Sequence, residues 1–98
     1  MLVFRREAEA EVLAAFDWYE AKRPGLGREF VAEVDAACTR ATAAPGVFPV
    51  VYRGLRRLVL RRFPYVIYFR EVEDAVEVFA VLHGRRDRNA LRGRTAQR

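Results

Sequence analysis

The first half of the chain repeats one spacing of apolar residues, and this repeat constrains the fold more than any other feature. Apolar side chains recur at positions i, i+4, i+7, i+8 and i+11 between residues 6 and 22, and again between residues 28 and 42. Residues at this spacing share one face of an α-helix. The two stripes are Ala8, Val12, Ala15, Phe16 and Tyr19, and then Phe30, Val34, Ala37, Cys38 and Ala41. We therefore predict two amphipathic helices.

The segment between these helices contains Pro24-Gly25 and Gly27. Because Pro and Gly end helices, this segment predicts a short turn. Two helices joined in this way form an antiparallel hairpin. Neither helix can bury its apolar stripe alone, so we expect both to pack on the second half of the chain.

Short β-prone segments supply that surface, at residues 2–4, 55–63, 65–69 and 76–82. Proline or polar residues separate the last three segments, which favours an antiparallel meander. We predict an α+β fold in which an N-terminal helical hairpin packs on one face of a three- to four-stranded antiparallel sheet. The 98 residues suit a single domain, residues 1–98. We expect about the last ten residues to form a tail or a frayed helix.

The two central strands are apolar at both alternating sets of positions. Simple alternation places Tyr65, Ile67 and Phe69 on one face and Val66 and Tyr68 on the other. The same pattern separates Val76, Val78, Ala80 and Leu82 from Phe79 and Val81. A sheet covered by helices on one face only is usually polar on its other face. From Asp87 onward Leu91 is the only large apolar residue, so we expect the tail to cover the second face poorly and favour a partner chain over another copy.

Charge is divided unevenly along the sequence. Residues 1–52 contain 6 basic and 8 acidic side chains, whereas residues 53–98 contain 12 basic and 5 acidic ones. A basic half predicts an anionic partner, either nucleic acid or an acidic protein segment. A solubilising surface is the alternative interpretation.

The cysteine and histidine content limits which disulfides and metal sites the chain can form. Cys38 is the only cysteine and His83 the only histidine, so the sequence predicts no disulfide, no zinc site and no cofactor. No apolar run reaches the length of a membrane span, and residues 1–6 lack the ordered regions of a signal peptide. We expect a cytoplasmic protein.

Several short motifs occur in a specific order. They are Trp18-Tyr19, Pro24-Gly25-Leu26-Gly27, Phe30, Pro45, Phe48-Pro49, Gly54-Leu55-Arg56-Arg57, Arg62-Phe63-Pro64-Tyr65-Val66-Ile67-Tyr68 and Val81-Leu82-His83-Gly84-Arg85-Arg86-Asp87. Together they resemble the RelE/ParE superfamily of toxins from type II toxin–antitoxin systems, and most closely its ParE-like, plasmid-stabilisation branch. The resemblance runs from about Val3 to Leu91. It implies a helical hairpin on a twisted antiparallel sheet, and a cognate acidic antitoxin that wraps the toxin in a hetero-oligomer.

Individual residues have both functional and structural interpretations. Arg56, Arg62 and His83 are the candidates for a reduced catalytic set, although for His83 we favour a role in ordering the turn that follows it. Trp18 lies about 100° from the core stripe, where it caps the helix–sheet seam or meets a partner, and we favour packing. Candidates for partner or target binding are Arg57, Arg61, Tyr68, Arg85, Arg86, Arg88 and Arg92.

Three functions follow from these features. The first is a ParE-like toxin, without enzymatic activity, that poisons a host complex such as DNA gyrase. The second is a RelE-like endonuclease that cleaves ribosome-bound messenger RNA. That chemistry needs a base, an acid and phosphate-binding cations, and the sequence offers only the reduced set of Arg56, Arg62 and His83 for it. The third is a small, basic, non-toxic RNA-binding domain, although no RNA-binding signature is present.

Overall fold

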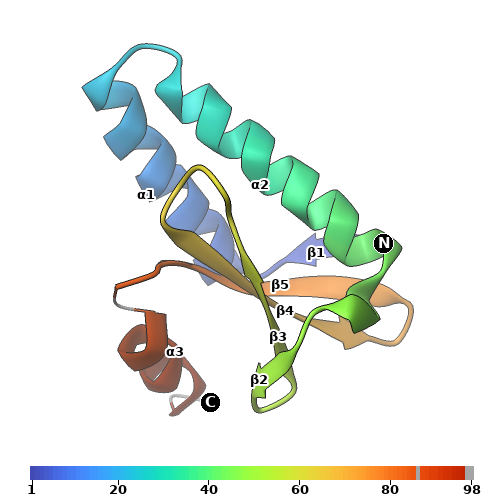
Figure 1. The fold of residues 1–98 in the computed structure, drawn as a ribbon. Coiled ribbons are helices and arrows are strands. Elements are labelled where there is room, and N and C mark those ends of the chain that lie inside the picture. Colours follow the sequence, from blue (N-terminus) through green and yellow to red (C-terminus); the bar gives the residue numbers. More distant parts are fainter. Residues whose placement is uncertain (86, 97–98) are drawn as a thin grey trace.

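The computed structural model describes residues 1–85 and 87–96 and shows a helical hairpin against a twisted sheet (Figure 1). The elements are β1 (Leu2–Phe4), α1 (Arg6–Lys22), α2 (Leu26–Ala43), the 3₁₀ turn Pro45–Val47, β2 (Val50–Tyr52), β3 (Leu55–Val59), β4 (Tyr65–Val72), β5 (Ala75–His83) and α3 (Asp87–Ala96). The two long helices lie at the positions that the apolar spacing predicts. The α+β class and the helical hairpin are therefore confirmed.

The sheet contains five strands in the order β1-β5-β4-β3-β2. β1 pairs with β5 in parallel, and the remaining neighbours are antiparallel. The prediction of three to four purely antiparallel strands is therefore wrong in strand number and in the direction of β1. β2 was missed because it has only three residues, directly after Pro49, too few for an alternation to be visible.

A close approach of the two helices fixes the hairpin. A Cβ atom on Gly27 would lie 2.8 Å from the backbone oxygen of Phe16, so only glycine fits at that position. The backbone N–H groups of Gly25 and Gly27 donate to the Glu20 carboxylate at 2.9 and 3.0 Å. Glu20 on α1 thus satisfies amides at the start of α2 that have no partner within the helix.

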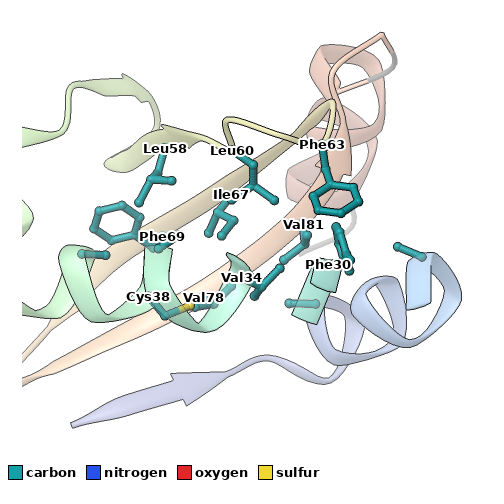
Figure 2. Close-up of a cluster of buried hydrophobic side chains, with 14 of the residues drawn as sticks. Phe30, Val34, Cys38, Leu58, Leu60, Phe63, Ile67, Phe69, Val78 and Val81 are labelled. Carbon is teal, nitrogen blue, oxygen red and sulfur yellow. The ribbon is translucent and has the colours of Figure 1, made fainter. Parts of the chain in front are cut away.

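The main core lies between the hairpin and one face of the sheet (Figure 2). Its largest buried members include Phe30 and Val34 on α2, Ile67 and Phe69 on β4, and Val78 on β5. The stripe of α2 is buried throughout its length, as its spacing predicts. Burial raises the pKa of the Cys38 thiol to about 11, which keeps this residue an inert apolar side chain of the same core.

A β-bulge in β5 changes which residues face the hairpin. Tyr68 pairs with Ala80, but the next residue, Phe69, pairs with Val78, so Phe79 is an extra residue in β5. A bulge of this kind shifts the alternation by one residue. Phe79 and Ala80 therefore both lie on the face away from the hairpin. Simple alternation placed Ala80 and Leu82 with Val78, and that assignment is wrong beyond the bulge.

α3 covers the second face of the sheet. Leu91 of this helix is 3% exposed and packs in a cluster with Tyr68, Phe79 and Leu82. The expectation that the polar tail would leave this face uncovered is therefore wrong. One leucine suffices because the cluster is small, and because Arg94 adds polar contacts to the sheet. The apolar second face is consequently not evidence for a partner chain.

β3 ends at Val59, so the predicted strand 55–63 is four residues too long. Residues 60–64 form a loop that returns the chain to β4, and Leu60 N–H donates to the Tyr65 carbonyl at 3.0 Å. In this loop the alternation no longer applies. Alternation along the predicted strand 55–63 would place Arg57 and Arg61 on one face and Arg56 and Arg62 on the other, but Arg61 and Arg62 lie on the loop, so this expectation is wrong.

Candidate functional site

Arg56 has a structural role. Its guanidinium donates to the carbonyl oxygen of Phe48 at 2.7 Å and lies 3.3 Å from the Glu71 carboxylate. These contacts join β3 to the segment before β2 and to the end of β4. The guanidinium is therefore occupied by groups of this chain.

Arg62 lies on the loop between β3 and β4. Its side chain donates to Glu29 of α2 at 2.6 Å, and Glu29 also binds Arg23 at 3.2 Å. The Glu33 carboxylate accepts the backbone N–H groups of Arg61 and Arg62 at 2.6 and 3.1 Å. Two glutamates of α2 thus anchor this loop, while the Arg61 side chain is exposed.

His83 ends β5 and orders the following turn, as the structural interpretation of this residue predicts. The backbone N–H of Arg85 donates to its Nδ1 atom at 3.2 Å, and its ring meets the Tyr65 ring edge-on at 5.4 Å. Gly84 N–H also donates to the Pro64 carbonyl at 2.8 Å. His83 is half-buried between these groups.

The three catalytic candidates do not form one cluster. Arg56 pairs with Phe69, whereas His83 pairs with Tyr65, four residues away along β4. This offset corresponds to roughly 13 Å along the strand. Within residues 1–85 and 87–96, no group of three His, Cys, Asp or Glu side chains could hold a metal ion.

The candidates for partner binding are scattered. Arg57 is half-buried on β3 opposite Tyr68, and Tyr68 is 2% exposed, so a partner cannot reach this tyrosine while α3 is docked. Arg92 is exposed on α3 and Arg85 is exposed directly after β5. Arg88 lies on α3, and Arg86 lies outside the described residues.

A groove of about 840 Å³ runs between α1 and the end of β5. Its lining residues are Glu11, Ala14, Ala15, Trp18, Tyr19, Pro64, Tyr65, Val81, Leu82, His83 and Arg85. Trp18 is 57% exposed at this groove, and the Lys22 ammonium lies 4.5 Å from its ring centre. The packing role favoured for Trp18 is seen only in part, because its ring contacts Tyr19 edge-on at 5.1 Å while more than half of the side chain is exposed. The sequence gives no sign of the groove beyond Trp18's position off the stripe, because its walls come from distant segments.

Glu11 of α1 lines this groove and contacts both β5 and α3. Its carboxylate accepts the Val81 backbone N–H at 2.8 Å and binds the Arg94 guanidinium of α3. Arg94 also donates to the Phe79 carbonyl, and its guanidinium lies 5.1 Å from the Phe79 ring centre. Burial raises the pKa of Glu11, although the Val81 N–H and Arg94 act in the opposite direction.

The helical hairpin packed on the five-stranded sheet defines the α+β class of this chain. A structure titled "Chromosomal ParDE TA system from P. aeruginosa" superposes with a TM-score of 0.67 at 21% identity, over 84% of this chain and 92% of that chain. Residues 2–88 match the family described as ParE toxin of type II toxin–antitoxin system, parDE. The chain therefore belongs to the ParE toxin family.

Curated relatives agree with this assignment. The proteins named Toxin ParE2 from Mycobacterium tuberculosis strains CDC 1551 / Oshkosh and ATCC 25618 / H37Rv are each 31% identical over 84 residues. These alignments cover 85% of this chain and 80% of each relative. The predicted resemblance to the ParE branch is confirmed. In the part of the chain that the structure describes, no helix combines the length and apolarity needed to cross a membrane.

Proposed function

We propose that this toxin acts in the cytoplasm by binding and inhibiting DNA gyrase, and that a cognate acidic antitoxin neutralises it. Membership of the ParE family supports the toxin assignment and the pairing with an antitoxin. Gyrase is the target that the ParE-like branch implies. The proposal therefore concerns which host complex this chain binds.

Two observations favour binding over RNA cleavage: Arg56 is separated from His83 along the sheet, and the guanidinium groups of Arg56 and Arg62 are held by groups of this chain. A nuclease must bring a base, an acid and phosphate-binding cations to one phosphodiester. Here Arg56 is bound by Phe48 and Glu71, and Arg62 by Glu29. These interactions hold the two guanidinium groups at different positions on the sheet and its loop.

The charge of the chain supports an acidic antitoxin. The net charge is +5 and the isoelectric point is near 10.1, and all of the positive excess lies in residues 53–98. Opposite charge accelerates association and favours acidic partners over basic ones. A negatively charged segment of the antitoxin would be attracted by the positive charge of Arg57, Arg85 and Arg92.

A supercoiling assay tests the gyrase proposal. Relaxed plasmid, ATP and purified gyrase are incubated with increasing amounts of the toxin, and the supercoiled product is measured on a gel. We expect supercoiling to stop at excess toxin and to return when the antitoxin is added. Unchanged supercoiling at a large excess of folded toxin would overturn the gyrase assignment. Cleavage of ribosome-bound message, lost in His83→Ala and Arg62→Ala, would instead support the RelE-like function.

A further inference from the structure

Strand β2 is an open edge of the sheet. In the part of the chain that the structure describes, β2 pairs with β3 on one side and with no strand on the other (Figure 1). Val47, Val50 and Val51, just before and within this strand, are 73%, 55% and 46% exposed. Edge strands usually carry charged side chains that prevent pairing with other chains. We call these three valines and the adjoining Arg53 the β2 edge, and its valines suit it to pairing with a partner strand.

The charge around the β2 edge is positive. Residues 36–70 contain no aspartate or glutamate but seven arginines, which are Arg40, Arg53, Arg56, Arg57, Arg61, Arg62 and Arg70. Carboxylates from other segments pair with Arg56, Arg62 and Arg70. Arg53 is exposed, and within the described residues it contacts Tyr52 and pairs with no carboxylate. The β2 edge therefore presents a positive charge beside its valines.

The turn after β2 fixes the position of Arg53. Arg53 and Gly54 have φ angles of 48° and 78°, as in tight turns between antiparallel strands. Asn, Asp or Gly usually occupies the first of these positions, because other side chains are strained at positive φ. The Arg53 Nε donates to the Tyr52 hydroxyl at 3.1 Å, and the guanidinium lies 5.4 Å from the centre of that ring. An arginine kept at a strained position on a surface is a candidate for binding.

The second open edge of the sheet, β1, offers a comparison. Among the described strands β1 also has a neighbour on one side only, and Val3 is exposed there. Val3 lies opposite Glu77 of β5, and the turn that leads into β5 contains the exposed residues Glu73 and Asp74. β1 thus has apolar side chains as β2 does, but acidic residues accompany them.

Two other occupants fit the β2 edge less well than an acidic protein segment. A second copy that paired through the same edge would bring two basic surfaces together, and like charges repel. Nucleic acid would be attracted by the arginines but would gain little from the valines, because its recognition rests on phosphate and base contacts. An extended protein segment with both apolar and acidic side chains matches both properties of the edge.

We propose that the β2 edge binds such an acidic, extended segment of the target complex, which adds a strand to the sheet beside β2. Backbone hydrogen bonds along β2 supply affinity, and apolar side chains of the segment pack on Val50 and Val51. A carboxylate of the segment pairs with Arg53, whose planar guanidinium suits a bidentate contact. This inference rests on the proposed inhibition of gyrase, and it adds the surface of the toxin and the chemistry of the contact.

Purified DNA gyrase without DNA is the probe for this contact. Calorimetric titration of the full-length toxin with gyrase gives the dissociation constant. Hydrogen exchange, read by mass spectrometry, then compares the free toxin with the complex. We expect the amides of β2 to exchange roughly tenfold or more slowly in the complex, whereas those of β1 should keep their rates.

Two variants of the β2 edge and two matched controls separate strand addition from general charge attraction. Arg53→Glu should weaken gyrase binding about tenfold or more. Val51→Lys should also weaken it about tenfold, although it adds a positive charge, because the ammonium group would have to leave water beneath the added strand. Arg28→Glu near the start of α2 and Val3→Lys on β1 make the same changes at other exposed residues, and should alter binding about twofold or less. Circular dichroism and affinity for the antitoxin should be unchanged in all four variants.

The outcomes distinguish this inference from the proposed function. Gyrase binding with equal affinity for all variants, and without protection of β2, would overturn the role of the β2 edge but leave the gyrase assignment intact. No binding of gyrase to the folded original toxin would overturn the proposed function and this inference with it. Stronger binding by Val51→Lys would show charge attraction without strand pairing, and would refute the inference.

The same measurements reveal the other occupants. Weaker antitoxin binding and unchanged gyrase binding in Arg53→Glu and Val51→Lys would assign the β2 edge to the antitoxin instead. Protection of β2 that rises with the concentration of toxin alone would assign it to a second copy, and protection by DNA alone would assign it to nucleic acid. Each of these results would overturn the proposed contact with the target.

Discussion

The two faces of the sheet are covered in different ways. On one face, the hairpin contributes a full stripe of buried residues that includes Phe30 and Val34. On the other face, Leu91 is the residue through which α3 joins the buried cluster, and Arg94 adds contacts to Glu11 and Phe79. Burial of apolar area is the main source of stability. We therefore expect the hairpin face to set most of the stability of the fold, and α3 to open separately from it.

This difference also places the candidate groove. It lies where the exposed side of α1 meets the end of β5, next to the chain that leads into α3. Trp18 and Arg85, which line the groove, are exposed, so substitutions at these two positions should leave the buried core intact.

The largest expected loss of stability comes from a substitution on the hairpin face of the sheet. Phe30→Ala removes a fully buried ring that contacts Tyr19, Phe63 and Tyr65. We expect the free energy of unfolding to fall by about 3–5 kcal/mol. Equilibrium unfolding in urea measures this change. A loss below about 1 kcal/mol would contradict the dominance of the hairpin face.

Leu91→Ala tests the α3 face and should have a smaller effect. The loss is limited by the free energy of docking α3, because the helix can undock while the sheet and hairpin stay folded. We expect the free energy of unfolding to fall by about 1–2 kcal/mol, with faster amide exchange at Tyr68 and Phe79. A loss as large as that of Phe30→Ala would show that the two faces unfold as one unit.

Glu11→Gln tests the contact between α1, β5 and α3, because it changes how stability depends on pH. Burial raises the pKa of Glu11 above its ordinary value of 4.5, so the folded protein holds this proton more tightly than the unfolded chain. The contribution of Glu11 to stability is therefore present at low pH and is lost as the pH rises from 4.5 through the raised pKa. Glutamine does not titrate, so the variant should gain stability relative to the original chain as the pH rises through this window. Urea midpoints over a pH series measure the difference, and a trend in the opposite sense would refute it.

The smallest expected effect is at the loop between β3 and β4. Arg62 and Glu29 form an ion pair in which the Arg62 side chain is 62% exposed. Because exposed ion pairs contribute little, Arg62→Ala should lower the free energy of unfolding by less than about 1 kcal/mol. The same variant should keep its toxicity, measured as growth arrest after induction. Lost toxicity with an unchanged fold would make Arg62 a functional residue.

The helices and the central strands could be predicted from the sequence because their signals are local. The stripe from Phe30 to Ala41 repeats at helical spacing, and β4 is densely β-prone. β2 and the parallel pairing of β1 could not be predicted, because both strands have three residues and depend on their neighbours. The bulge at Phe79 was invisible because one extra residue changes the faces without changing composition.

Less of the site could be predicted. His83 as the residue that orders the turn was predicted correctly, because a histidine before glycine at a strand end has few other local roles. The contacts of Arg56 with Phe48 and of Arg62 with Glu29 depend on segments 8 and 33 residues away in sequence. The sequence does not predict that α3 covers the second face, because Leu91 is the only large apolar residue of this segment. The contacts of Arg94 with Glu11 and Phe79, which help to hold α3 in place, depend on residues far away in sequence.

Native-state hydrogen exchange tests the division between the two faces most directly. The account predicts that amides of α3 exchange by local opening, roughly a hundredfold or more faster than amides of α2 and of the central strands β4 and β5. The amides of α2 should exchange only through global unfolding. Equal protection of α3 and α2 would contradict the account, because the C-terminal helix would then be part of the same cooperative unit as the hairpin.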